Sequence, residues 1–472
     1  MITTLFIENF IIKINDFLLI LLLINLAFIG ILGLSRLIIL KSGTRTSKYN
    51  SLTKFPLVSI HLPICNEPPE IVIETIKNVL QLNYPNFELI VISNNTEDSS
   101  IWKPVEAFCK RNQHVKFWNY KNVYGYKAGA LNIALQYTSK TAEYIFILDA
   151  DYKLRRNALK TAVWKIENEH VDLVQFPQSY WNTSQGTYGL VSNYNHYFDC
   201  YMTRNSFRQT CLPTGTLSII KKSVFTKGFI WPTDSITEDA NLGVEMLSRK
   251  LKISFSNERI GSGVMPTTII DYFKQYQRWL FGNFQTLFKM FKTNGIALKE
   301  KFKLATLLTA WLNLLSFTFV TGLIFLPVLA ILKVNIIPLA SVFCINILVH
   351  LAIQFIMLFK LSKKNYKKAL QGIFIHISTI DIGSFYWLSY FINAKKPFVR
   401  TNKFINESKQ LPGLYFAIPI LFFLNTIILF GLNYMFLAPL FLAFGLVFYY
   451  SKKQLILEID CSKFNFKYAI QS

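Results

Sequence analysis

The chain has 472 residues, more than one ordinary domain holds, and 52% of them are hydrophobic. Because the apolar residues are clustered and the mean hydropathy is positive, this composition indicates a membrane protein. The formal net charge of +23 comes from basic residues that flank apolar stretches, which argues against nucleic-acid binding and for contact with a membrane surface. The six cysteines show no metal-ligand spacing, so we expect free thiols in a reducing compartment.

The first apolar stretch follows a short N-terminal segment, residues 1–16. No charge occurs between Phe17 and Ser35, and a helix of that length is about 28 Å long, which is enough to cross a bilayer. We therefore predict a transmembrane helix over 17–40. Arg36 and the basic residues that follow it predict that the chain then continues in the cytoplasm.

Residues 50–265 alternate between strand and helix patterns, which predicts a cytoplasmic α/β domain with a mostly parallel, Rossmann-like sheet. We expect Asn66 to cap the first helix of this domain. The predicted strands are 58–62, 87–92, 115–118, 144–148 and 172–176, and the predicted helices are 70–82, 102–111, 157–169 and one that the segment 124–132 opens.

The strand predicted at 144–148 ends in Asp149-Ala150-Asp151. Alternate residues of an extended chain point the same way, so both carboxylates lie on one side of the strand end, where ligands of α/β sheets bind. Two such carboxylates suit a hard divalent cation that also binds phosphate oxygens. Taken alone, the motif is equally typical of a turn after a strand.

Three further groups of residues have charged or polar side chains that could bind a ligand or take part in a reaction. Lys127 stands at the start of a predicted helix, where a phosphate or a sugar would bind well. Thr237-Glu238-Asp239 opens another helix, a position that the helix dipole favours for any acid. Gln275, Arg278 and Trp279 lie in an aromatic, basic segment, 266–303, that we expect to lie at the membrane interface. Without a motif, Arg278 would be a solvated charge and Trp279 an interface anchor.

The C-terminal part is mostly apolar. We predict spans over 304–332 and 336–359 and a two-helix hairpin over 411–450, followed by a cytoplasmic tail, 451–472. Residues 369–394 contain His376 and Asp381 and have basic flanks on both sides, which favours a helix lying in the interface; the alternative is a further span that breaks the charge rule.

The order of these motifs resembles that of the membrane-integrated glycosyltransferases of family 2, of the cellulose synthase type. The matching motifs are Asn66-Glu67-Pro68, Lys127-Ala128-Gly129, Asp149-Ala150-Asp151, Thr237-Glu238-Asp239 and Gln275-x-x-Arg278-Trp279. Each is common by chance, but all of them in order are specific. Within 395–410, Phe398-Val399-Arg400-Thr401-Asn402-Lys403 is similar to the gating loop of that family, with Arg400 at a position that is usually Val.

The resemblance implies a nucleotide-diphospho-sugar transferase domain inserted between transmembrane helices, in a multi-pass protein of the inner or plasma membrane. It implies Asp239 as the catalytic base and Asp151 as the ligand of Mg²⁺ or Mn²⁺. The residues implied to bind the nucleotide sugar are Asn66, Glu67, Asn94, Lys127, Asp149, Asp151 and Arg278. Those implied for the acceptor are Glu238, Gln275 and Trp279, and those implied for the gating loop are Phe398, Thr401 and Lys403.

Two positions depart from the family pattern. Ser93 and Asn94 stand where two aspartates often contact the nucleotide base, and Tyr152 stands where cellulose synthases usually have His, so the nucleotide preference stays open. The expected function is an inverting transfer from UDP-glucose or a similar UDP-hexose to a β-linked polysaccharide, coupled to translocation. The alternatives are a non-processive transferase that glycosylates a membrane lipid and a catalytically inactive scaffold of a polysaccharide export complex. No export partner is identified by the sequence.

Overall fold

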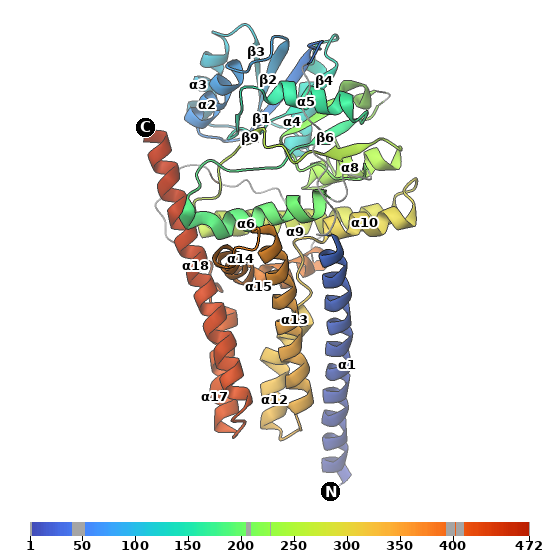
Figure 1. The fold of residues 1–472 in the computed structure, drawn as a ribbon, viewed down its shortest axis with the longest axis vertical. Helices are drawn as coiled ribbons and strands as arrows, with labels where there is room; N and C mark the ends of the chain where they lie inside the picture. The colour runs from blue at the N-terminus through green and yellow to red at the C-terminus, as the bar shows by residue number, and fades with distance from the viewer. Residues whose placement is uncertain are drawn as a thin grey trace.

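The computed structural model describes residues 2–39, 52–203, 209–226, 228–392, 402 and 410–471. Figure 1 shows three layers: an α/β domain, a layer of helices that lie across the molecule, and a group of upright helices. The N-terminus lies at the far end of the upright helices, and the C-terminus lies beside the α/β domain (Figure 1).

The main sheet has seven strands in the order β3-β2-β1-β4-β7-β6-β8. All neighbouring pairs are parallel except the two that involve β7, so the mostly parallel sheet predicted from the sequence is confirmed. The strands are β1 (Val58–Ile64), β2 (Phe87–Asn94), β3 (Val115–Tyr120), β4 (Tyr144–Ile147), β6 (Leu173–Gln175), β7 (Ser218–Lys221) and β8 (Ile253–Phe255), and a small second sheet pairs β5 (Lys153–Leu154) with β9 (Gly261–Ser262).

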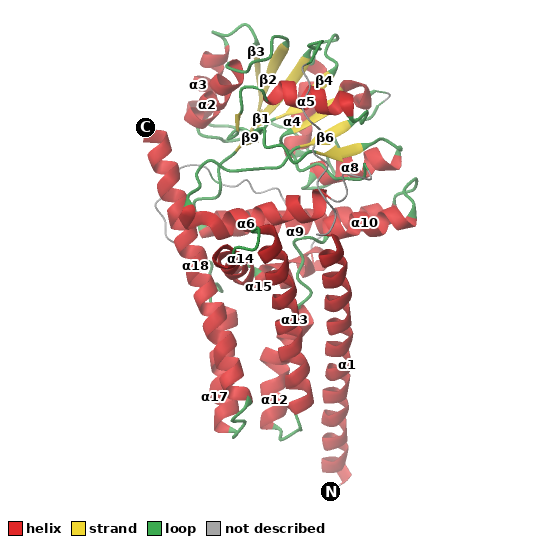
Figure 2. Ribbon diagram, in the orientation of Figure 1, coloured by secondary structure: helices red, strands yellow, loops and turns green. Residues whose placement is uncertain are grey.

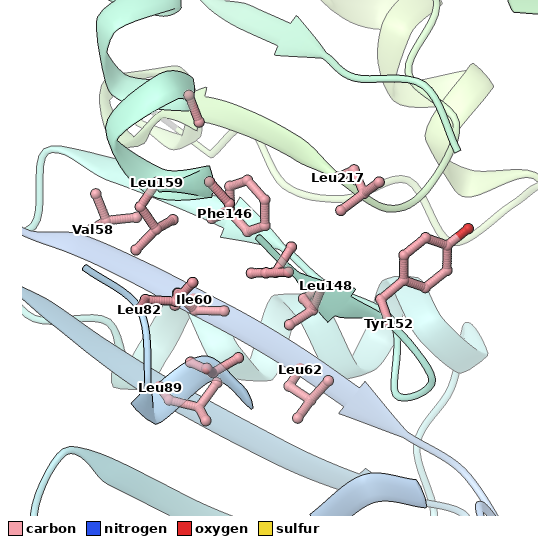
Figure 3. Packing of buried hydrophobic residues seen from close by; sticks show 14 of the residues in the cluster. Val58, Ile60, Leu62, Leu82, Leu89, Phe146, Leu148, Tyr152, Leu159 and Leu217 are labelled. Carbon is pink, nitrogen blue, oxygen red and sulfur yellow. The ribbon is translucent and has the colours of Figure 1, made fainter. Parts of the chain in front are cut away.

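Both faces of the sheet are buried, which explains the continuous apolar runs in its central strands. Phe146 and Leu148 pack on one side together with Val58, Ile60 and Leu62 of β1 (Figure 3). The alternate residues Ile145 and Ile147 pack on the other side. The first side is covered by α2 (Pro69–Leu80), α3 (Ser99–Cys109) and α5 (Ala158–Asn168), and the second by α4 (Tyr126–Tyr137) and α8 (Glu238–Ser248).

The layer across the molecule contains α6 (Tyr188–His196), which continues as the π-helical turn η2 (Tyr197–Met202), α9 (Ile269–Lys292) and α10 (Leu298–Leu308) (Figure 2). In α9 the buried residues Ile269, Tyr272, Phe273, Tyr276 and Leu280 recur at helical spacing and form one apolar stripe. That stripe packs against α6 and the C-terminal helices, so this layer joins the sheet domain to the upright helices.

Among the described residues, three helices are long and apolar enough to cross a membrane: α1 (Ile2–Ile39), α13 (Ile337–Leu361) and α18 (Leu437–Gln471). Two shorter apolar stretches accompany them, α11 to α12 (Ser316–Ile331) and α17 (Ala417–Gly431). The predicted N-terminal segment 1–16 and tail 451–472 are not separate, because α1 and α18 run through them without a helix-breaking proline or glycine at the junction.

The span predicted over 304–332 is wrong at its start. Residues up to Leu308 belong to α10, and the apolar helix begins only at Ser316. Between them the backbone N–H of Asn313 donates to the carbonyl of Gly383 (2.9 Å), which belongs to the distant helix α15 (Ile380–Phe385), so the chain turns here instead of continuing as one helix.

The segment predicted as an interface helix begins earlier than residue 369 and is not one helix. It forms α14 (Tyr366–Ser378), breaks at Thr379 and continues as α15 (Ile380–Phe385) and α16 (Ser389–Ile392). Its position in the membrane interface stays a prediction. Asp381 forms an ion pair with Lys452 of α18 (2.7 Å), whose side chain is only 1% exposed.

Candidate active site

A cleft lies at the carboxyl ends of the strands, against the layer of helices. We call it the carboxylate cleft. All of the sequence-predicted site residues in the described part of the chain line it except Asn66; they are Glu67, Asn94, Lys127, Asp149, Asp151, Glu238, Asp239, Gln275, Arg278 and Trp279. The segment after β4 supplies Asp149 and Asp151, helix starts supply Lys127, Glu238 and Asp239, and α9 supplies the last three.

Lys127 stands at the centre of this cleft. Its ammonium donates to Asp149 Oδ1 (2.5 Å) and to the carbonyl of Gly215 (2.6 Å), and it lies 3.9 Å from Glu238 Oε1. Burial has the largest single effect on the pKa of Lys127 and lowers it, but the attraction of Asp149 and Glu238 and the hydrogen bond to Asp149 together outweigh burial. The pKa is therefore raised, and the side chain stays positively charged. Lys127 therefore holds carboxylates from β4 and α8 beside one another.

Asp239 has the protonation behaviour expected of a general base. Burial, and next the neighbouring Glu238, raise the pKa of Asp239 to about 7. The backbone N–H of Ala240 donates to Asp239 Oδ1 (2.8 Å) and orients the carboxyl group. Gly215, which has φ +81°, approaches so closely that a Cβ there would lie 3.0 Å from Asp239 Oδ2. The carboxylate can therefore accept a proton near neutral pH.

Asp149 and Asp151 are the candidate ligands of a divalent cation. The described residues contain no cluster of three or more His, Cys, Asp or Glu that could bind a metal ion alone. Asp151 Oδ2 accepts from the backbone N–H of Val264 (3.2 Å), and the N–H of Asp149 donates to Thr216 Oγ1 (3.0 Å). Two fixed carboxylates fit Mg²⁺ or Mn²⁺, whose other ligands would be diphosphate oxygens and water.

Helix α9 places Gln275, Arg278 and Trp279 on one face, because residues three and four apart are neighbours on a helix. Tyr194 donates its hydroxyl to Gln275 Oε1 (2.7 Å) and packs edge-on against the Trp279 ring (5.6 Å). Burial lowers the pKa of Arg278, whereas Glu238 and Asp149 oppose that effect, so a charged guanidinium faces the carboxylates.

A second cleft adjoins the first and shares Asp239 and Trp279 with it. We call it the aromatic cleft, because Tyr194, Tyr197 and Trp311 also line it. Trp311 stacks on Tyr197 (5.6 Å) and lies 4.9 Å from Trp279. Asp239 therefore lies where the carboxylate cleft meets a cleft lined by aromatic rings, whose flat faces are of the kind that sugar rings stack on.

Asn66 differs from the other predicted site residues in its position, and the nucleotide-sugar binding implied for it stays a prediction. It has φ 52°, its side-chain amide donates to the carbonyl of Asn95 (3.2 Å), and its residue does not line the carboxylate cleft. The N-cap of α2 is Pro68 and has no side-chain cap, so the capping prediction for Asn66 is wrong. Asn94 lines the cleft, and its amide donates to the carbonyl of Ile64 (2.9 Å). Phe398, Thr401 and Lys403 lie outside the described residues.

Several cleft residues were not singled out from the sequence. Gln178 and Tyr180 follow β6, Gly215 precedes β7, and Trp311 comes from the turn before α11. Among these residues, only Gly215 has a local sequence signal, because it lies in the turn-rich segment 212–216. Tyr180 and Trp311 belong to aromatic-rich surroundings, in which their position depends on the tertiary fold.

The chain was compared with protein families and known proteins. The model of "Glycosyl transferase family 2" matches residues 59–229. The probable glucomannan 4-beta-mannosyltransferase 7 of Oryza sativa subsp. japonica is 26% identical over 61% of this chain and 50% of that protein. The UDP-forming cellulose synthase 1 catalytic subunit of Komagataeibacter xylinus is 23% identical over 49% of this chain and 31% of that protein.

The chain thus spans half or less of the length of these two relatives. A probable glycosyltransferase of Sulfolobus acidocaldarius is 24% identical over 73% of this chain and 75% of its own length. Among solved structures, a mannosyltransferase from Pyrobaculum calidifontis in complex with GDP-Man and Mn²⁺ shares the fold, with a TM-score of 0.56 and 16% identity over 81% of this chain and 100% of that one. Residues 59–229 therefore form a family 2 glycosyltransferase domain, which this chain joins to candidate membrane helices.

Proposed function

We propose that this protein is an inverting glycosyltransferase that moves a hexose from a nucleotide sugar to a hydroxyl group of a membrane-associated acceptor. The observation that carries the proposal is the position of Asp239, which lines both the carboxylate cleft and the aromatic cleft and has a pKa of about 7. A base at such a junction lies between a donor in the first cleft and an acceptor in the second.

The chemistry follows from these residues. Asp239 takes the proton of the acceptor hydroxyl while that oxygen attacks the anomeric carbon on the face opposite the leaving group. The bond between that carbon and the diphosphate oxygen breaks, and the nucleoside diphosphate leaves with the bonding electrons. Lys127 and Arg278 supply the positive charge that stabilises the departing diphosphate. A Mg²⁺ or Mn²⁺ ion held by Asp149 and Asp151 would add to this charge stabilisation.

The donor is proposed to be UDP-glucose or a similar UDP-hexose, which agrees with the name of the UDP-forming cellulose synthase relative. GDP-mannose is the second candidate, since two comparisons are with proteins named as mannosyltransferases, one of them in complex with GDP-Man. Asn94, at the end of β2 and in the lining of the carboxylate cleft, is the residue that would contact the base.

The acceptor is proposed to be a growing β-linked polysaccharide that passes into the membrane region, with the catalytic domain on the cytoplasmic side. The aromatic cleft supports this assignment, because it continues from Asp239 towards α10 and the turn that holds Trp311. A membrane lipid as the acceptor is the alternative, because α9 and α10, which help to line that cleft, lie in the layer next to the upright helices (Figure 1).

Product analysis tests the proposal. Membranes that contain the wild-type chain are supplied in turn with radiolabelled UDP-glucose and GDP-mannose, with membranes that lack the chain as the control. Label in ethanol-insoluble material that a β-glycanase releases supports a polysaccharide, whereas label extracted by organic solvent indicates a glycolipid. No chain-dependent transfer from either donor would contradict the proposed activity and would favour an inactive scaffold.

A further inference from the structure

Helices α1 and α13 meet the layer of helices that lie across the molecule (Figure 1). A small cavity lies between the two helices near this end. It is lined by Leu32 and Arg36 of α1, by Leu314 and by His350 and Gln354 of α13. The two helices pack closely here, because a Cβ on Gly33 would overlap the side chain of Ile353. We call it the α1–α13 cavity.

Arg36 brings an uncompensated positive charge to this cavity. Its guanidinium lies 5.6 Å above the ring of Tyr201. In the part of the chain that the structure describes, it forms no ion pair with a carboxylate. Arginine remains charged under all ordinary conditions. A half-buried cation without a protein counter-charge is costly, and an anion in the cavity would remove that cost.

Gln354 is the second independent observation. It is 4% exposed, and its amide makes no hydrogen bond to any residue that the structure describes. It lines both the α1–α13 cavity and a neighbouring one, which Asn313 also lines. Asn313 Nδ2 is likewise buried without a partner. Buried amides are normally hydrogen-bonded, so these two groups indicate a ligand with acceptor atoms.

The histidines nearby do not supply a negative charge. His350 Nε2 lies 3.0 Å from His376 Nε2, and His196 lines the neighbouring cavity. Burial lowers the pKa of His196 to about 3 and that of His376 to about 4, and Arg36 adds to both effects. Both rings are therefore neutral at pH 7. Arg36 is the fixed charge of the cluster, and its field favours an anion.

The residues around the cavity indicate what kind of molecule would carry the anion. On the outer faces of the two helices, Phe28, Ile31 and Leu34 of α1 and Leu348 and Ile356 of α13 are exposed. Such side chains suit acyl chains, so an anion that reaches Arg36 along this surface arrives attached to a lipid.

We propose that the α1–α13 cavity binds the phosphate of a membrane phospholipid, with Arg36 as the charged ligand and Gln354 as a hydrogen-bond donor. The two residues would fix α1 against α13 through the bound headgroup. This site is separate from the carboxylate cleft and does not depend on which sugar the enzyme transfers.

Native mass spectrometry of the purified full-length chain in detergent tests the proposal. Three probes separate the sources: dioleoyl phosphatidylglycerol, dioleoylglycerol, which has the same acyl chains without phosphate, and inorganic phosphate, which has no acyl chains. We expect the phosphatidylglycerol adduct alone to form and to raise the melting temperature. Equal stabilisation by inorganic phosphate, or equal retention of dioleoylglycerol, would overturn the lipid-phosphate assignment.

Variants locate the site. Arg36→Gln should weaken phosphatidylglycerol binding by about tenfold, the effect of losing one charge-assisted hydrogen bond. Gln354→Leu keeps the charge, removes the unpaired amide and should also weaken binding, which keeps the test open if Arg36→Gln folds poorly. Arg111→Gln removes an exposed arginine of the sheet domain and is the matched control. Wild-type binding by both Arg36→Gln and Gln354→Leu would refute the site.

Discussion

The Lys127 ammonium lies 2.5 Å from Asp149 Oδ1, so the cation at the start of α4 pairs with the first carboxylate after β4. The same ammonium lies 3.9 Å from Glu238, the neighbour of the proposed base. One lysine thereby links the proposed donor-binding residues to the proposed base, and a change at Lys127 should affect both functions.

Lys127→Met should weaken nucleotide-sugar binding and shift the pH dependence of transfer to higher pH. The reason for the shift is that the positive charge of Lys127 lowers the pKa of Asp239, so its removal leaves the base protonated up to a higher pH. Rate profiles of wild type and variant between pH 5 and about pH 9 would measure it. Lys116→Met, which removes a lysine paired with Glu88 away from the cleft, should leave the profile unchanged.

Asp239→Asn should retain nucleotide-sugar binding and lose turnover by about 10²–10⁴-fold, because it removes a base and keeps the shape. For the wild type, a base with a pKa of about 7 is protonated below that pH, so the rate should rise as the pH passes upward through 7. Turnover with saturating donor measures both. Asp234→Asn, in the preceding turn and outside both clefts, is the control; near-normal turnover of Asp239→Asn would refute the assignment.

Removal of divalent cations should abolish transfer, since without a cation between them the carboxylates of Asp149 and Asp151 would repel the departing diphosphate. We expect EDTA to stop the reaction and Mg²⁺ or Mn²⁺ to restore it. Calorimetry of UDP binding with and without Mg²⁺ should show a metal-dependent gain in affinity that Asp151→Ala loses. Full transfer in excess chelator would contradict the metal role of Asp151.

Loss of either partner of the ion pair between Lys452 and Asp381 should destabilise the protein more than loss of both partners. Lys452 is 1% exposed and also lies over the rings of Phe273 and Tyr415. Asp381→Asn or Lys452→Met alone leaves a buried charge and should cost about 3–5 kcal/mol, whereas the double variant should recover much of that loss. Thermal unfolding in detergent measures it. Loss of the exposed pair Lys110 and Glu106 should change stability by less than about 0.5 kcal/mol.

The transmembrane topology gives a prediction of its own. The turns that contain Lys333 and Asn433 lie at the end of the upright helices away from the sheet domain, and both residues are exposed. Lys363 is exposed at the opposite end, between α13 and α14. A cysteine at 333 or 433 should react with a membrane-impermeant thiol reagent in intact cells, and one at 363 should react only after lysis.

The native cysteines determine the background for that experiment. Cys109, Cys200, Cys211 and Cys344 are buried, so only Cys65 and Cys461 need replacement. Labelling of position 363 in intact cells would contradict the predicted cytoplasmic side of the sheet domain.

The parallel sheet and most of the carboxylate cleft could be predicted because they depend on local signals. Apolar runs define β1, β2 and β4, and charged residues directly after strands or at helix starts must meet at one edge of the sheet. β7 was not predicted because it has only four residues and pairs antiparallel with its neighbour. It therefore lacks the alternation of strand and helix patterns by which the parallel strands were recognised. Asn66 was misplaced because its backbone conformation is set by contact with the segment at Asn95.

The start of the predicted span 304–332 shows a second limit. Residues 304–332 are mostly apolar throughout, but the helix is interrupted at Asn313. The backbone N–H of Asn313 bonds to Gly383, which lies 70 residues away in sequence. Hydropathy counts apolar residues and does not detect a tertiary hydrogen bond. Trp311 could not be placed for the same reason, because its stacking on Tyr197 depends on that turn.

Helix α18 has 35 residues and is about 52 Å long, so it runs from the far turn of the upright helices to the side of the sheet domain. Near its C-terminal end, Asn182 donates to Ser462 (2.8 Å) and the N–H of Leu190 donates to Glu458 (2.8 Å). The segment held in this way directly follows Gln178 and Tyr180, which form one wall of the carboxylate cleft. A fragment shortened to the sheet domain would lose these contacts with α18. Soluble truncations would therefore be poor substitutes for the whole chain in crystallisation or inhibitor screening.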